Sequence, residues 1–198
     1  MRTARDATGV IMKFGMVKAA AVTPEIKTGD PEYNSREIIA RLAELAKLGA
    51  ELAVFPEMCV TGYTAADLLF TRELLDETAA AVKAIAAATP DNMLAFVGAP
   101  IAQGGKLYNC AVAVSAGKVL GVVPKTELPD YGEFYEKRYF TPAFDGVEQC
   151  ESLCAPMGNL LFKCSTEPLL TVGCEICEDM WSDAPPSIDL CRAGATVI

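Results

Sequence analysis

The 198-residue sequence contains no histidine. This absence excludes Cys–His dyads, Ser–His–Asp triads and histidine-based metal sites, because each of them needs an imidazole. The sequence also lacks any run near the roughly 20 apolar residues of a membrane-spanning helix. It has no cluster of lysine and arginine, and its net charge of −9 disfavours binding to phosphate backbones or anionic lipid. We therefore expect a soluble, cytoplasmic protein that binds neither nucleic acid nor membrane.

Cysteine occurs eight times and hydrophobic residues make up 52% of the chain. The cysteines are scattered through apolar segments, as at Cys110, Cys164 and Cys174. A chain of this length can bury a sizeable core without disulfide bonds. We expect reduced, mostly buried thiols in one domain or part of one.

Apolar runs alternate with segments of helical periodicity along most of the chain. Residues 1–11 show no such pattern, and we expect them to form an irregular extension ahead of a domain over 12–198. Expected helices run from Asn34 or Ser35 to Gly49, over 73–88, and from the Pro185–Pro186 pair to Ala193. Expected strands cover 14–22, 52–55, 93–97, 109–115, 118–123, 159–163, 169–173 and 195–198. This alternation, with a hairpin turn at 116–117, predicts an α/β layered domain with a mixed sheet.

Three segments each place a reactive side chain just after an apolar strand, where α/β folds usually gather their sites. They contain Glu57, Lys125 and Cys177. Taken singly, these residues are usually a solvated carboxylate, a solvent-facing amine and a small buried hydrophobe. Together they meet a specific need: without histidine, a cysteine nucleophile requires another base and a cation near the developing oxyanion.

The three segments together resemble the Glu–Lys–Cys signature of the nitrilase, or carbon-nitrogen hydrolase, superfamily. More narrowly, PEMCVTGY, KTELPDYGEFYEKRYF and GCEICEDMW are similar to the amidohydrolase domain of the glutamine-dependent NAD synthetase family. The opening FGMVKAAAVTPEIKTGDPEYN is similar as well. The resemblance implies a nitrilase-type four-layer α-β-β-α sandwich. Because the chain ends within the β-like run 196–198, we expect that sandwich to be C-terminally truncated.

The resemblance also assigns catalytic roles. Cys177 is implied to attack the side-chain amide of glutamine, and Glu57 to move the protons. Lys125 is implied to stabilise the oxyanion of the tetrahedral intermediate. Glu136 is implied to hold Lys125 charged and oriented, although Glu133 lies close by in the sequence.

Substrate recognition is implied to involve Tyr63, Tyr131 and Glu178, which would surround the amino-acid end of glutamine. A carboxylate can pair with an α-ammonium group, and tyrosines can line the aliphatic stem. The alternative is that the tyrosines are packing residues and that Glu178 is structural.

The implied partners are L-glutamine and a synthetase domain that uses the released ammonia to amidate deamido-NAD. That synthetase domain would use ATP and Mg, whereas the glutaminase reaction needs no cofactor or metal. Nothing here resembles the synthetase domain: neither phosphate-loop pattern is present, and Gly104–Gly105 is interpreted as a loop turn. The family also implies a homo-oligomer.

Other functions remain open from the sequence. The chain could be a stand-alone amidase acting on a small amide, or a non-catalytic fragment or assembly protein. The Cys174-x-x-Cys177 spacing could be a redox centre or half of a zinc site, with Cys150 and Cys154 as two further thiolates. Because the chain ends abruptly, we expect low or partner-dependent activity. We also expect an activated Cys177 to alkylate faster than buried thiols.

Overall fold

The computed structural model describes residues 15–198. The expected extension over 1–11 and the first residue of the strand expected at 14–22 lie outside this range. A seven-stranded mixed sheet has the order β1-β2-β3-β4-β5-β7-β6, with β1, β2 and β3 parallel, and β4 antiparallel to both β3 and β5. Its strands are β1 (Ala19–Ala21), β2 (Leu52–Val54), β3 (Leu94–Gln103), β4 (Lys106–Ser115), β5 (Lys118–Pro124), β6 (Val147–Cys150) and β7 (Ala155–Gly158).

Side chains of β3 alternate between two apolar layers, as the two-residue period of a strand requires. Ala95, Val97 and Ala99 pack in the core cluster on one face, and Leu94 and Phe96 pack in the cluster on the other. The sheet is therefore covered on both faces, which explains its nearly continuous apolar strands.

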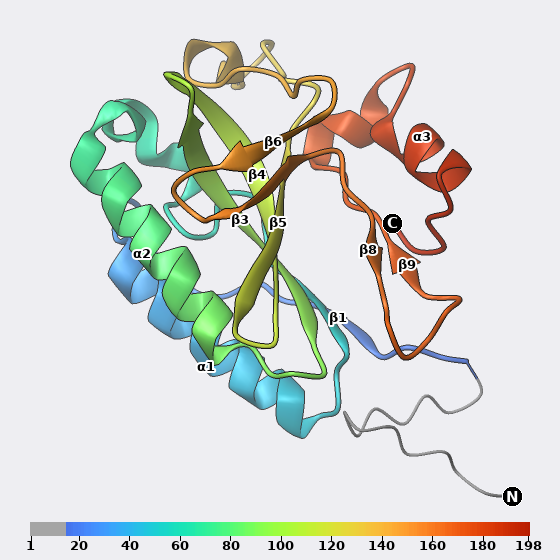
Figure 1. Cartoon of the computed structure of the whole chain (residues 1–198). Helices are drawn as coiled ribbons and strands as arrows, with labels where there is room; N and C mark the ends of the chain where they lie inside the picture. Colours follow the sequence, from blue (N-terminus) through green and yellow to red (C-terminus); the bar gives the residue numbers. More distant parts are fainter. Residues whose placement is uncertain (1–14) are drawn as a thin grey trace, which may run out of the picture.

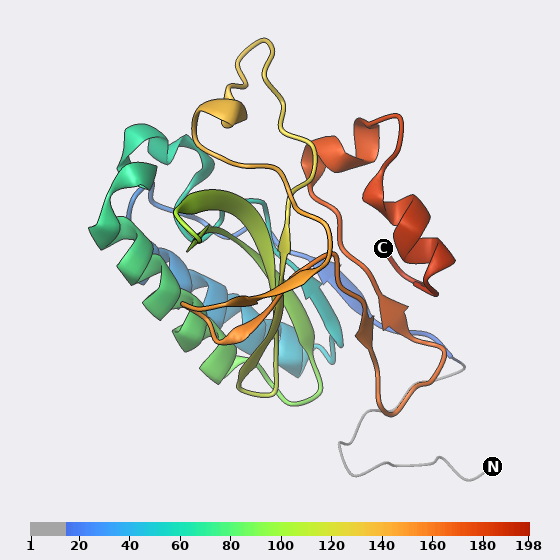
Figure 2. The same ribbon diagram turned by 45° about the horizontal axis from the view of Figure 1, so that its top comes forward.

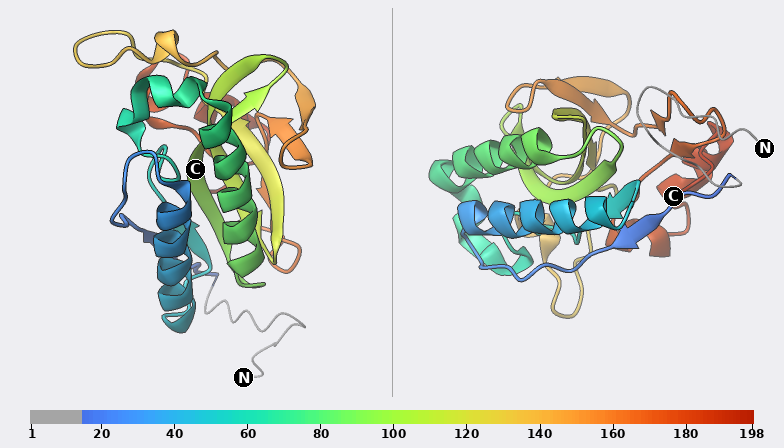
Figure 3. Two further views of the ribbon diagram at one scale, coloured as in Figure 1. Left: turned by 90° about the vertical axis from the view of Figure 1, so that its left-hand side faces the viewer. Right: turned by 90° about the horizontal axis from the view of Figure 1, so that it is seen from below.

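Two helices, α1 (Pro31–Lys47) and α2 (Arg72–Ala88), lie side by side on one face of the sheet (Figure 1; Figure 3). Ile38 and Leu42 of α1 and Val82 and Ile85 of α2 join the cluster that contains Val97. Their spacing follows the helical repeat, so the apolar stripe faces the sheet.

The expected start of the first helix at Asn34 or Ser35 was wrong. The helix begins at Pro31, because the Asp30 side chain caps it by accepting a hydrogen bond from the Tyr33 N–H at 2.9 Å. Asn34 is instead buried inside the first turn and its amide donates to the backbone oxygens of Lys27 and Val60.

The opposite face of the sheet carries the remaining layers, with β8 (Phe162–Lys163), β9 (Thr171–Val172) and α3 (Pro186–Arg192). The Phe162 ring meets Phe96 of β3 edge to face at 5.4 Å between centroids. Val197 adds a single parallel bridge to Val172. These strands are shorter than expected at 159–163, 169–173 and 195–198. The order of layers is nevertheless helix, sheet, sheet, helix, as expected for an α-β-β-α sandwich (Figure 1).

The β6–β7 hairpin was not predicted, and neither were three short helices, the first of which is η1 (Tyr63–Phe70). With η2 (Glu136–Arg138) and η3 (Cys177–Trp181), η1 lies at one end of the sheet (Figure 2). Residues 125–140 form the expected long loop, which projects from this end and contains η2. The turn at Gly104–Gly105 joins β3 to β4, as expected.

All eight cysteines are free thiols, but the expectation that most are buried was wrong. Cys59, Cys110 and Cys150 are buried, whereas the other five are partly or fully exposed. The exposed ones lie in turns and short helices outside the core strands. Among residues 15–198, no helix is long and apolar enough to cross a membrane.

Candidate active site

Glu57 and Lys125 follow two strands of the main sheet and meet at its end. Glu57 comes three residues after β2, and Lys125 directly follows β5. The Lys125 ammonium Nζ lies 2.7 Å from Glu57 Oε1. Lys125 has 0% side-chain exposure and Glu57 has 18%, so the carboxylate is the part of the pair that reaches solvent.

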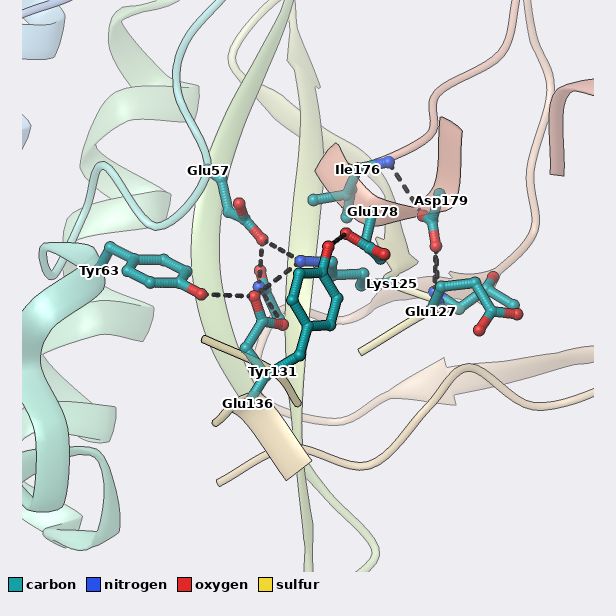
Figure 4. A network of polar contacts seen from close by, with 11 residues as sticks. Glu57, Tyr63, Lys125, Glu127, Tyr131, Glu136, Ile176, Glu178 and Asp179 are labelled. Atoms are coloured by element: carbon teal, nitrogen blue, oxygen red, sulfur yellow. Dashed lines mark hydrogen bonds and ion pairs between the residues drawn. The ribbon is translucent and has the colours of Figure 1, made fainter. Parts of the chain in front are cut away.

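Glu136 provides the second carboxylate for Lys125. Its Oε1 lies 2.8 Å from Lys125 Nζ and also accepts a 2.7 Å hydrogen bond from the Tyr63 hydroxyl (Figure 4). Glu136 is buried in η2, whereas Glu133 is exposed. The geometry therefore favours Glu136 over Glu133 as the partner of Lys125.

Asn109 belongs to this cluster and was not predicted from the sequence. Its Nδ2 donates to Glu57 Oε1 at 2.6 Å and lies 3.5 Å from Glu136 Oε2. The position is on β4, whose neighbour β5 leads into Lys125, and the Lys125 N–H donates to the Asn109 carbonyl at 2.8 Å. A polar residue within an otherwise apolar strand was the signal that could have identified it.

Cys177 is the first residue of η3 and lies in a strained turn after β9. Its φ is +48°, in the left-handed region that few residues other than glycine adopt. Such strain is concentrated at functional sites, where the surrounding fold maintains it. Cys177 and Glu57 line the same cavity of about 190 Å³, between the end of β2 and the segment after β9. A larger cavity of about 320 Å³ at another part of the sheets contains none of the predicted site residues.

Charge and burial set the protonation states in this cluster. Burial lowers the pKa of Lys125, but the charges of Glu57 and Glu136 and the hydrogen bonds that Lys125 donates to them outweigh burial and raise it above its usual value. Lys125 is therefore a cation at neutral pH. Burial, followed by the negative charge of Glu57, raises the pKa of Cys177, while Lys125 opposes the rise.

The raised Cys177 pKa changes the expectation about thiol reactivity. At rest this cysteine is a neutral thiol, and hydrogen bonding to Glu57 is among the causes of its raised pKa. Fast alkylation at neutral pH therefore requires Glu57 to accept the proton during attack. Cys174 is less reactive still, because burial raises its pKa to about 12.

Tyr131 and Glu178 form a separate, exposed pair, and Glu178 directly follows Cys177. The Tyr131 hydroxyl donates to Glu178 Oε2 at 2.8 Å, and this hydrogen bond raises the pKa of Tyr131 (Figure 4). The Tyr63 hydroxyl is directed to Glu136 instead, so its present contact is with the charged cluster. The substrate-binding roles of these three residues stay predictions.

Within residues 15–198, no three side chains of histidine, cysteine, aspartate or glutamate are grouped so that they could hold a metal ion. Cys150 and Cys154 lie at the two ends of the β6–β7 turn. Cys174 and Cys177 lie on the other side of the main sheet's core, around the segment after β9.

The sequence model that describes the carbon-nitrogen hydrolase family matches residues 18–198 of this chain. The chain belongs to the carbon-nitrogen hydrolase family. Within that family it matches the N-terminal part of glutamine-dependent NAD(+) synthetases. Over 188 residues it is 38% identical to the glutamine-dependent NAD(+) synthetase from Mycobacterium leprae. This match covers 93% of the present chain and 28% of that protein. The family resemblance inferred from the three motifs is confirmed.

Solved structures of carbon-nitrogen hydrolases have the same fold. The glutamine-dependent NAD(+) synthetase from Cytophaga hutchinsonii superposes with a TM-score of 0.78 at 26% identity, over 91% of this chain and 30% of that one. An amidase from Nesterenkonia sp. superposes with a TM-score of 0.68 over 96% of this chain and 66% of that one. At 20% identity the amidase supports the fold alone. The present chain thus spans less than a third of the synthetases that it matches.

Proposed function

We propose that this chain carries a glutaminase active site that hydrolyses L-glutamine to glutamate and ammonia through a thioester on Cys177. The observation that carries the proposal is the buried Lys125 cation, held by Glu57 and Glu136 beside an exposed cysteine in a strained turn. A base, a cation and a nucleophile at one cavity are what acyl transfer requires in a protein without histidine.

In the first half-reaction, Glu57 accepts the Cys177 thiol proton as the sulfur attacks the amide carbon. Lys125 stabilises the negative charge that develops on the amide oxygen. The C–N bond then breaks as Glu57 returns the proton to the leaving nitrogen, which gives ammonia and the thioester. Glu136 and Asn109 keep Lys125 and Glu57 in position through the contacts described above.

In the second half-reaction, Glu57 accepts a proton from a water molecule that attacks the thioester carbonyl. Collapse of the second tetrahedral intermediate breaks the C–S bond, releases glutamate and returns the proton to sulfur. Because the Cys177 pKa is raised, the released thiolate takes up this proton and returns to the neutral thiol.

Glutamine is proposed as the substrate because Glu178 is placed near the nucleophile and can pair with an α-ammonium group. Tyr131 would hold that carboxylate, and Tyr63 would line the substrate's stem. The proposal agrees with the names of the similar proteins, which are glutamine-dependent synthetases. The runner-up is an amidase for small aliphatic amides, since Glu57, Lys125 and Cys177 would perform the same chemistry on them.

The released ammonia is proposed to pass to an NAD synthetase domain that uses ATP and Mg to amidate deamido-NAD. This part of the proposal rests on the similarity to synthetases about three times as long, of which the chain covers 28%. We further propose that the domain assembles as a homo-oligomer.

The test is ammonia release from L-glutamine and from butyramide by the chain and by two variants. Cys177→Ala removes the nucleophile, and Cys191→Ala removes another exposed thiol, in α3. We expect release from glutamine by the chain and by Cys191→Ala only. Release from butyramide alone would favour the runner-up, and unchanged release by Cys177→Ala would contradict the mechanism.

A further inference from the structure

We propose that Asp179 is a positioning residue that locks the turn carrying Cys177 to the loop carrying Lys125. Its carboxylate joins two backbone segments that come from different layers of the fold. The catalytic importance of this positioning rests on the proposed function, whereas the hydrogen bonds of Asp179 do not depend on it.

Both oxygens of Asp179 accept hydrogen bonds from backbone N–H groups. Oδ1 accepts from Thr126 at 2.9 Å and from Glu127 at 2.7 Å, and Oδ2 accepts from Ile176 at 2.9 Å (Figure 4). Thr126 directly follows Lys125, and Ile176 directly precedes Cys177. One side chain therefore holds the residue next to the cation and the residue next to the nucleophile.

The burial of Asp179 is not explained by packing alone. Its relative exposure is 1%, and a buried carboxylate is costly unless hydrogen bonds satisfy it. The three N–H donors supply those bonds, and they lie 3, 52 and 53 residues away in the sequence. A carboxylate is suited to this position because it only accepts, and because its two oxygens can serve opposite segments.

Apart from the exposed hydrogen bond between Tyr131 and Glu178, the remaining contact described between the main sheet and the layer of β8 and β9 is apolar. Phe96 and Val123 of the main sheet pack against Val172 of β9 and against Ile176, which follows β9. Apolar packing is non-directional, so it fixes the separation of layers better than their register. Directional hydrogen bonds to Asp179 fix the register, and with it the position of Cys177 relative to Lys125 and Glu57.

The strained backbone of Cys177 requires such an anchor. A residue at φ +48° persists only where neighbouring groups hold it there. The Ile176 N–H is one residue before the strained position, and Asp179 lies two residues after it, so their hydrogen bond closes the turn around Cys177.

The test compares Asp179→Asn with Asp183→Asn. Asparagine at 179 has nearly the same size, but its NH₂ group must face at least one backbone N–H, so it cannot accept all three hydrogen bonds. Asp183 is exposed and lies four residues further along, so Asp183→Asn makes the same change in charge without this contact. Asp179→Ser, which removes the buried carboxylate altogether, is the second variant if Asp179→Asn does not fold.

The first measurement is the rate at which iodoacetamide alkylates Cys177 between pH 6 and 10, with the labelled residue identified by mass spectrometry. With Glu57 correctly placed, the rate at neutral pH exceeds what the ionised thiol alone would give. In Asp179→Asn we expect a neutral-pH rate about 10- to 100-fold lower and a profile that follows simple thiol ionisation, because small displacements disrupt proton transfer. Asp183→Asn should retain the original profile.

The second measurement is kcat and KM for L-glutamine. We expect kcat to fall by about 10- to 100-fold and KM to change much less, because alignment of the reacting groups is lost while Tyr131 and Glu178 remain. Folded Asp179 variants with an unchanged alkylation profile would overturn the inference, whatever the glutaminase activity. A changed profile in a chain that releases no ammonia would support the positioning role and count against the proposed function.

Discussion

The backbone of Glu57 crosses Gly98 of β3 so closely that a Cβ atom on that glycine would lie 2.7 Å from the Glu57 carbonyl carbon and 2.5 Å from the Pro56 oxygen. Gly98 also accepts a hydrogen bond from the Val60 N–H at 3.0 Å. The loop that presents Glu57 is thus seated on a strand position where only glycine fits.

Replacing Gly98 with alanine should therefore displace Glu57, the proposed general base. The added methyl group meets backbone atoms, which cannot turn aside as a side chain can. We expect Gly98→Ala to lower the free energy of unfolding by about 1 to 3 kcal/mol and kcat by about 10- to 100-fold. Urea unfolding and ammonia release would measure the two effects.

Gly121→Ala is the matched control on the same sheet. A Cβ there would meet the tips of the Leu160 and Phe162 side chains, which can adjust. We expect a smaller loss of stability and nearly full activity. Equal losses in kcat for the two glycine variants would contradict the seating of Glu57 on Gly98.

Lys125→Met should leave Glu57 and Glu136 without their shared cation. Breaking a buried ion pair by removing one partner leaves uncompensated charge, so we expect a loss of about 3 to 5 kcal/mol in the free energy of unfolding. Ammonia release should also be lost, since the oxyanion has no cation. Lys118→Met, at the exposed start of β5, should change the stability by less than about 0.5 kcal/mol. Similar losses in both variants, by urea unfolding at pH 8, would be evidence against the buried cluster.

Asn109→Leu and Asn109→Asp should test the donor role of the amide at nearly constant side-chain size. The Asn109 Nδ2 donates to Glu57, whereas its buried Oδ1 has no hydrogen-bond partner among residues 15–198. Leucine removes the donor, and aspartate places a third carboxylate beside Lys125. We expect both to reduce kcat by about tenfold or more, and aspartate to lower the melting temperature further than leucine. An unchanged kcat in both variants would show that the donor role is misassigned.

Alkaline pH should destabilise the fold. The pKa of Tyr63 is raised by burial and by its hydrogen bond to Glu136, and the pKa of Lys125 is raised above 10.5 by its two carboxylates. Because both folded-state values exceed the unfolded ones, the stabilising contributions are fully present below pH about 10 and are lost as the pH rises beyond it. Urea unfolding between pH 8 and 11 would measure this decline. Tyr63→Phe should make the decline shallower, while Tyr135→Phe, at an exposed position, should leave it unchanged.

Glu178→Gln should discriminate between glutamine and simple amides. If Glu178 pairs with the α-ammonium group, its loss should raise KM for glutamine by about 10- to 100-fold. Butyramide has no ammonium group, so any activity on it should be retained. Glu127→Gln, which changes the charge of a nearby exposed carboxylate, is the control. An unchanged KM for glutamine in Glu178→Gln would remove this residue from the proposed substrate site.

Local patterns in the sequence were sufficient for the main strands and helices. The continuous apolar runs of β3 and β4 and the helical spacing of Ile38 and Leu42 depend only on neighbouring residues. The β6–β7 hairpin was missed because VEQC and APMG carry little β propensity, and pairing with β5 stabilises them instead. The start of α1 was misplaced because Asp30, rather than Asn34, has the backbone geometry of a cap.

The sequence by itself determined the family and predicted the site residues Glu57, Lys125 and Cys177, because each lies in a motif of adjacent residues. The resemblance pointed to Glu136 without excluding Glu133, and the tertiary structure shows that Glu136 is the one that reaches Lys125. Tertiary structure alone decided that Asn109 and Asp179 belong with them. The hydrogen bonds of these side chains join segments 11 to 53 residues apart. Such contacts arise only when the layers pack, because the ends of β2, β4, β5 and β9 are brought together by burial of apolar faces rather than by local sequence.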